Sequence, residues 1–346
     1  MHSQTTTGSS ETIRKTAFNF SAYKERLVSH KKSGKIDPTF LQWFVGFSEG
    51  DGSFIVSKGR LFFIINQKEE KVLHRIRTEL GFGKVSNYKS YSRFIVADRD
   101  NIERLIHLFN GNLVLHKTNT RFRLWLQDWN LVSASAVPGG NCHDGERFAF
   151  TGGIRHPLCY QSLHQHDVGE GQSQPHRERC DKLGVCPLLG GHREERRVTP
   201  LPQNKLPSFE NNGWLSGFTD ADGCFNAVQI RDSRHSLGWR LRLRFILDQK
   251  SEKDLLERVK DFLGSGVISR RQGVDDMWRL TCTSIPSHQV VINYFSRYPL
   301  RTIKKVSFLR FASLLRYIAK RPVLPWEGKV LKRVENLIKK SSSQPI

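Results

Sequence analysis

A repeated motif constrains the fold of this chain more than any other feature. FVGFSEGDGSF occurs at 44–54 and LSGFTDADGCF at 215–225, so that equivalent residues lie 171 positions apart. Each motif is an apolar run that ends in two carboxylates separated by one residue, and a glycine follows. Carboxylates near the C-terminus of a helix face the negative end of its dipole, which costs up to about 1 kcal/mol. An unfavourable arrangement that occurs twice needs a chemical reason.

The residues around both motifs predict the same order of elements. In the first copy, Asp37 and Pro38 are typical of an N-cap and a first helical residue. Two strand-like runs follow the motif, then a helix that ends at Gly81, a second hairpin and two helices. The second copy repeats this order from 211–223 and adds a helix at 326–340. The predicted fold class is α+β: two pseudo-symmetric αββαββα repeats, each an antiparallel sheet with helices on one face.

The repeat also predicts how the chain is divided. We expect an N-terminal extension at 1–36, a first repeat at 37–131, a linker or insert at 132–205 and a second repeat at 206–346. The linker is rich in Gly, Pro, His and Gln and has no sustained periodicity, which favours a flexible, basic tether. Zinc binding is the alternative, although Cys180 and Cys186 are spaced more widely than in a structural zinc knuckle.

The charge balance predicts a polyanionic partner. The chain has 55 Lys and Arg against 33 Asp and Glu, a net charge of +22. Such an excess is typical of proteins that bind nucleic acid or an anionic membrane surface. No apolar run approaches the about 18 residues of a membrane span, so we expect no membrane partner. The first residues lack the apolar run of a secretory signal, so we expect the protein not to be secreted.

The paired acids suggest a metal site. In a single motif, the acids would be expected to bind backbone N–H groups of the next turn; their repetition favours a function. If the two helices pack side by side, Asp51 and Asp222 emerge together at one end. Small residues that permit such packing are Gly46, Gly50, Ser216, Gly217 and Ala221. Adjacent carboxylates repel unless a cation separates them, and Mg²⁺ prefers oxygen ligands. Paired Mg²⁺ ions can act on a phosphodiester.

The two motifs resemble the signatures of the single-chain LAGLIDADG homing endonucleases, with DADG the stronger match and EGDG a variant. The resemblance covers 37–131 and 206–340 but neither the extension nor the linker. It implies a monomeric endonuclease that cleaves a long, asymmetric double-stranded DNA target by metal-assisted hydrolysis and promotes intron mobility. The implied cofactor is Mg²⁺, with Mn²⁺ as a substitute. The implied location is the organelle that carries the host intron, a mitochondrion or a chloroplast.

The same resemblance implies roles for individual residues. The metal ligands would be Asp51 and Asp222, with the carbonyl groups of Gly50 and Ala221. Glu49 and Asp220 would organise the base of the two helices. Further catalytic residues, which would position or activate solvent, would be Gln67, Gln249, Lys117 and Lys304, with Lys305 a competitor of Lys304.

Alternating residues in the strands predict a DNA-binding surface. Arg240, Arg242 and Arg244 share one face of a strand, opposite the face that carries its leucines. An antiparallel ribbon fits the major groove, where arginine pairs with guanine. The rest of the expected surface is Arg231, Arg234, Arg270, Arg271 and Arg279, and in the first repeat Lys58, Arg60, Lys84, Asn87, Lys89 and Arg93. Contact with phosphates alone is the other interpretation of this surface.

The sequence leaves two other functions open. An RNA maturase would use the same scaffold to assist splicing of its host group I intron, and a DNA-binding regulator would use it without cutting. Loss of the metal-site acids would favour either one, and both acids are present. The longer interval from Asp222 to Gln249 than from Asp51 to Gln67 predicts a longer hairpin in the second repeat, which suits an asymmetric target.

Overall fold

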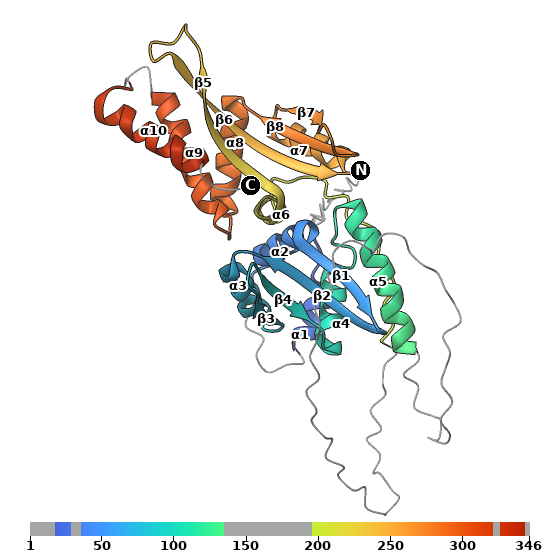
Figure 1. Cartoon of the computed structure of the whole chain (residues 1–346). Helices are drawn as coiled ribbons and strands as arrows, with labels where there is room; N and C mark the ends of the chain where they lie inside the picture. Colours follow the sequence, from blue (N-terminus) through green and yellow to red (C-terminus); the bar gives the residue numbers. More distant parts are fainter. Residues whose placement is uncertain (1–17, 29–35, 135–195, 321–325, 343–346) are drawn as a thin grey trace, which may run out of the picture.

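Two four-stranded antiparallel sheets form the framework of the protein (Figure 1), which confirms the predicted fold class. The computed structural model describes residues 18–28, 36–134, 196–320 and 326–342. The first sheet has the order β1-β2-β4-β3 and the second the order β5-β6-β8-β7. The first-sheet strands are β1 (Gly52–Ser57), β2 (Arg60–Gln67), β3 (Lys84–Asn87) and β4 (Ser92–Val96). The second-sheet strands are β5 (Gly223–Arg231), β6 (Trp239–Lys250), β7 (Val267–Arg270) and β8 (Met277–Cys282).

Helices cover one face of each sheet. The helices of the first repeat are α2 (Pro38–Asp51), α3 (Glu70–Leu80), α4 (Arg99–Phe109) and α5 (His116–Ala134). Those of the second are α6 (Trp214–Asp222), α7 (Lys253–Leu263), α8 (Ile285–Arg297), α9 (Lys304–Lys320) and α10 (Gly328–Ser342). Aromatic side chains fill the layer between sheet and helices, with Phe54 and Phe63 against Phe109 in the first repeat. Phe225 and Phe245 pack against Phe295 in the second.

The hairpin of β5 and β6 is longer than its counterpart, as the sequence predicted. Its nine and twelve residues replace the six and eight of β1 and β2. The extra length would expose apolar side chains, and α10 covers them together with the residues just before it: the rings of Trp239 and Trp326, two residues before α10, lie 6.0 Å apart. Figure 1 shows α9 and α10 together beside this hairpin. The additional helix α10 therefore packs against the part of the hairpin that the first repeat lacks.

Two segments outside the predicted repeats pack on the first repeat. Helix α1 (Ser21–Val28) lies in the predicted N-terminal extension, and its Tyr23 is buried. Residues 196–205, from the end of the predicted linker, run along α4 and α5. Trp129 donates its indole N–H to the carbonyl of Arg196, and Gln203 donates its side-chain amide to the carbonyl of Val114. Helix α5 continues through Ala134, three residues into the predicted linker, and residues 1–17, 29–35 and 135–195 lie outside the described residues.

The two repeats meet where α2 and α6 cross, at the centre of Figure 1. A Cβ atom on Gly46 would overlap the carbonyl oxygen of Trp214, and one on Gly217 would overlap the carbonyl oxygen of Trp43. The contact is reciprocal, because each glycine meets the residue equivalent to its partner's contact. Glycine at these two positions is what lets the helix backbones touch, as the small residues of the motifs predicted.

We expect Gly217→Ala to lower the free energy of unfolding by about 1–3 kcal/mol, because its methyl group has to displace the backbone of α2. Urea denaturation measures the effect. The matched control is Gly59→Asn in the β1–β2 turn, where no atom lies within 4 Å of an added Cβ and asparagine tolerates the left-handed backbone. A Gly217→Ala protein as stable as this control would contradict the close crossing.

Candidate active site

Two tryptophans link the repeats across the helix crossing. The indole N–H of Trp43, on α2, donates to Asp220 Oδ2 on α6 over 2.8 Å. The indole N–H of Trp214, on α6, donates to Glu49 Oε2 on α2 over 2.5 Å. All four side chains are almost completely buried. Each motif therefore supplies one donor and one acceptor to the other, which fixes the register of the two helices.

Glu49 and Asp220 also hold the segments that lead into α5 and α9. Glu49 Oε1 accepts the backbone N–H groups of Val114 and Leu115 over 2.8 and 2.6 Å. Asp220 accepts the N–H of Arg301 over 2.6 Å and the hydroxyl of Thr302 over 2.5 Å. Burial raises the pKa of Glu49 to about 8, and the N–H donors oppose this rise by stabilising the charged form. The first acid of each motif thus connects the helix crossing to the helix that follows.

The last acids of the motifs lie together at the ends of α2 and α6. Gly50 brings the helices close here: an added Cβ would overlap Ala221 Cβ and lie 3.0 Å from Asp222 Oδ2. Gln67 Nε2 donates to Asp51 Oδ2 over 2.5 Å, and Gln249 Nε2 donates to Asp222 Oδ2 over 2.6 Å. The structure therefore brings the four predicted residues Asp51, Asp222, Gln67 and Gln249 into one cluster.

The surroundings of the cluster raise the pKa of both motif acids. Burial, and after it the charge of Asp222, raise the pKa of Asp51 to about 7. Burial also raises the pKa of Asp222, while its hydrogen bond to Gln249 lowers it. Desolvation makes the charged form of both carboxylates less favourable, and a bound positive charge would offset this cost.

Both predicted lysines reach this cluster, from different directions. Lys117 is the second residue of α5, and its Nζ lies 2.8 Å from Gln249 Oε1 of the other repeat. Lys304 begins α9, and its Nζ donates to the carbonyl oxygen of Ala221 over 2.7 Å. Burial lowers the pKa of both lysines. Lys305 is exposed on α9, so the structure distinguishes between the two candidates.

Two further acids hold the lysine-bearing helices from across the interface. Glu252 Oε1, just before α7, accepts the backbone N–H of Lys117 over 2.9 Å. Glu69 Oε2, just before α3, accepts the N–H of Ile303 over 2.7 Å. Each acid follows the second strand of its own repeat and binds the start of the lysine helix in the other repeat. The repeats therefore position each other's lysines.

The donor set of the cluster fits a hard divalent cation. Asp51 and Asp222 supply carboxylate oxygens, and the carbonyl of Ala221, a predicted ligand, accepts a hydrogen bond from Lys304 Nζ. Mg²⁺ is commonly bound by one or two carboxylates together with substrate phosphates. The residues present would hold such an ion once a phosphate is there to complete its ligands.

The uncovered face of the second sheet carries four of the predicted arginines, Arg240, Arg242, Arg244 and Arg279, and Arg234 and Arg271 lie just beyond strand ends. Arg244 donates to Asn226 Oδ1 over 2.8 and 3.1 Å. Arg279 forms two hydrogen bonds of 2.7 and 2.6 Å with Asp248, which Arg271 also approaches to 3.4 Å. Arg240 and Arg234 both contact Asp232, while Arg242 is exposed and has no acidic partner among the described residues.

The predicted residues of the first repeat are more dispersed. On its uncovered face, Arg60 lies over the ring of Phe62 and Arg93 donates to Asn66, with Lys84 on the neighbouring strand. Lys58 and Lys89 lie in the two hairpin turns. Three predicted residues lie elsewhere: Asn87 donates to Glu70 of α3, and strand alternation places Arg231 and Arg270 on the helix-covered face.

The sequence interpretation missed the reciprocal hydrogen bonds that Trp43 and Trp214 donate to the acids of the other repeat. Trp43 and Trp214 occupy equivalent positions in the two motifs, so the repeat itself contained the signal. The other missed groups are Glu69 and Glu252. They precede α3 and α7 but differ by one residue in their distance from Gln67 and Gln249, which hides their equivalence. The linker cysteines considered for zinc lie outside the described residues.

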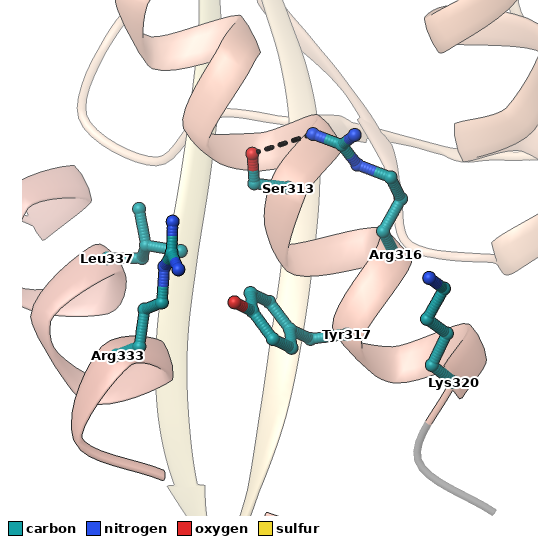
Figure 2. Close-up of a pocket in the computed structure, with 6 residues that line it drawn as sticks. All are labelled: Ser313, Arg316, Tyr317, Lys320, Arg333 and Leu337. Carbon is teal, nitrogen blue, oxygen red and sulfur yellow. Dashed lines mark hydrogen bonds between the residues drawn. The ribbon is translucent and has the colours of Figure 1, made fainter. Parts of the chain in front are cut away.

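A separate cleft of about 400 Å³ lies between α9 and α10 (Figure 2). Its lining residues are Ser313, Arg316, Tyr317, Lys320, Arg333 and Leu337. The three cations are exposed, and no carboxylate lines the cleft. The cleft does not include the acids at the ends of α2 and α6, so it is a second basic surface. None of the helices in the described ranges is long and apolar enough to span a membrane.

Comparison with protein families finds a match to the LAGLIDADG endonuclease model over residues 44–128 and 215–315, more than half of the chain. Among similar curated proteins, probable intron-encoded endonuclease 4 of Neurospora crassa is 28% identical over 287 residues. That alignment covers 81% of this chain but only 40% of the relative. An uncharacterized cox1 intron-2 protein of Schizosaccharomyces pombe is 27% identical over 306 residues, 88% of this chain and 73% of the relative.

Solved structures share the fold at low sequence identity. The meganuclease I-SmaMI bound to uncleaveable DNA has a TM-score of 0.59 and 16% identity, covering 90% of this chain and all of that one. The LAGLIDADG meganuclease I-AabMI bound to uncleaved DNA has a TM-score of 0.56 and 18% identity, covering 88% and 98%. These likenesses concern the two-sheet architecture.

The pKa of Asp51 generates a prediction about stability. Between its ordinary value of 3.8 and about 7, the folded protein keeps a proton that the unfolded chain has released, so stability falls as pH rises through this range. We expect Asp51→Asn to remove this cost: in EDTA, its melting temperature should exceed that of the wild type at pH 8 and converge with it towards pH 4. The control is Asp254→Asn, an exposed acid of α7. A constant difference at all pH values would contradict the assignment.

Proposed function

The chain belongs to the LAGLIDADG endonuclease family, and from this premise we propose that it is a site-specific homing endonuclease that makes a double-strand break in a long, asymmetric DNA target. The observation that carries the proposal is the convergence of Asp51 and Asp222, one from each repeat, at the touching ends of α2 and α6. Each repeat thereby brings one acid and one glutamine to a shared site. A single chain with two half-sites acts as a monomer.

The residues around the acids suit phosphodiester hydrolysis. Bound Mg²⁺, for which Mn²⁺ can substitute, would stabilise charge on the attacking and leaving oxygens. Gln67 and Gln249 hold one oxygen of each carboxylate, which leaves the other free to bind the ion. Lys117 Nζ lies beside Gln249 and has a lowered pKa, so it can orient the attacking water and exchange a proton with it. Lys304 Nζ has the equivalent role beside Ala221.

The uncovered faces of the two sheets would hold the DNA. Arginines on β6 and β8 are oriented by neighbouring amides and carboxylates, a geometry that suits base edges in the major groove. The relatives are named for introns, which supports an intron-encoded protein that promotes the mobility of its host intron. A host gene in an organelle, and a mitochondrial one in particular, agrees with the cox1 intron of the second relative.

We expect Asp222→Asn to lower the rate of double-strand cleavage by about a hundredfold or more, the usual loss when one group that stabilises developing charge is removed. Binding of the target should remain, because Asp222 binds Gln249 and the metal rather than a base. A cleavage assay and a gel-shift assay on the fused exon sequence that flanks the host intron measure the two effects. Asp254→Asn is the control, and wild-type cutting by Asp222→Asn would contradict the proposed role.

RNA maturation is the second candidate, and the cleft between α9 and α10 favours it. This cleft offers Arg316, Lys320 and Arg333 (Figure 2), and its two helices pack against β5 on the covered side of the second sheet. A phosphate backbone could therefore bind there while the DNA site stays open. A protein with both activities would use the helices for intron RNA and the sheets for DNA.

The double variant Arg316→Ser/Arg333→Ser tests this second candidate. Loss of two phosphate contacts to single-stranded RNA should reduce the slope of log affinity against log salt concentration by about 1.4. Filter binding of the intron transcript measures the slope, and DNA cleavage by the same variant should be unchanged. An unchanged slope for RNA would exclude the cleft as an RNA-binding surface.

A further inference from the structure

The uncovered face of the first sheet has an apolar centre. Ile55 pairs with Phe62 across β1 and β2, and Ile64 pairs with Ile95 across β2 and β4. Phe62 and Ile64 are two residues apart on β2, so the four side chains lie next to one another on one face. We name them the apolar quartet. Ile55 is 37% exposed and the other three are half-buried, although no helix covers them.

The second sheet has polar side chains at three of these four positions. When the sheets are aligned on Gln67 and Gln249, the pair Ile55–Phe62 corresponds to Asn226–Arg244. The pair Ile64–Ile95 corresponds to Ile246–Thr281. Arg244 donates a hydrogen bond to Asn226, so the second sheet has a hydrogen-bonded polar pair where the first sheet has the apolar pair Ile55–Phe62.

We propose that the two repeats read chemically different half-sites: the apolar quartet selects thymine through its C5-methyl group, and Arg244 with Asn226 selects guanine. The inference rests on the proposed DNA endonuclease function and specifies its substrate. Thymine is the one base with a methyl group in the major groove, and apolar side chains contact it there. Guanine presents two acceptors to arginine at the same place.

The apolar quartet also discriminates by what it cannot bind. Its four side chains have no donor or acceptor, so a cytosine amino group or the guanine acceptors would be buried against them without a hydrogen bond. Leaving such a group unsatisfied weakens binding by about 5- to 150-fold. Arg60, whose guanidinium lies 5.7 Å from the centre of the Phe62 ring, borders the quartet and can contact the adjacent phosphate. The quartet therefore has the composition of a recognition surface with a cationic edge.

Base analogues test the inference without changing the protein. The target is selected by cleavage from a randomised duplex pool, and photocrosslinking from 5-iododeoxyuracil with peptide mapping assigns each half-site to a repeat. Deoxyuracil then replaces every thymine of one half-site, which removes the methyl group and keeps all hydrogen-bonding groups. We expect binding to weaken by about fourfold for each contacted methyl in the half-site of the first repeat. The same replacement opposite the second repeat should have a smaller effect, because Ile246 is the one apolar side chain at the four equivalent positions.

Two variants locate the effect. Phe62→Ala should lose sensitivity to deoxyuracil at one position, because the methyl it contacts no longer has a partner. Arg244→Ala is the matched control at the equivalent position: it should keep that sensitivity and lose the penalty for 7-deazaguanine, which lacks the N7 acceptor, in the other half-site. Their free energies of unfolding verify that both variants fold.

The possible failures are distinguishable. Equal effects of deoxyuracil in both half-sites, or a Phe62→Ala protein with wild-type sensitivity, would overturn the inference while the nuclease remains active. If no duplex in the pool is bound or cut, the proposed function itself fails. In that case, self-association of the wild type that Phe62→Ala abolishes would show that the quartet contacts protein instead.

Discussion

The backbone contact between α2 and α6 is the constraint on which the rest of the structure depends. Gly46 and Gly217 each meet a carbonyl oxygen of the facing helix, so the helices approach as closely as their backbones allow. Two buried carboxylates, Glu49 and Asp220, then find indole donors across the crossing. Asp51 and Asp222 lie two residues further along, at the ends of α2 and α6, and the close crossing therefore brings them together. Each acid is unfavourable at the end of its own helix, and together the two acids form the proposed cation site.

The symmetry of the crossing does not extend to the surfaces. The contacts between the repeats are reciprocal: Trp43 and Trp214 each donate to an acid of the other repeat. Glu69 and Glu252 each accept a backbone N–H group from the other repeat. Towards the sheet faces the repeats diverge, with a longer hairpin and an added α10 in the second and an apolar quartet in the first. A chemical step common to both strands needs similar centres, whereas an asymmetric target needs different surfaces.

The repeated motif was enough to predict the fold class, the meeting of Asp51 with Asp222 and the role of small residues between the helices. Those inferences depended on local patterns: helix periodicity, strand alternation and glycine. Asn87, by contrast, was predicted on the DNA-binding surface but binds Glu70 of α3, because strand alternation at a short edge strand cannot be fixed without its register. The bonds of Glu252 and Glu69 join distant parts of the chain, and no local pattern encodes them.

Anomalous diffraction from crystals of the protein with target DNA and Mn²⁺ would test the central claim most directly. The claim is that the ends of α2 and α6 form one composite metal site. It predicts Mn²⁺ peaks within bonding distance of the carboxylates of both Asp51 and Asp222, with a phosphate of the target completing the ligands. Mn²⁺ bound elsewhere on the protein, with no peak between these two carboxylates and the DNA, would contradict it.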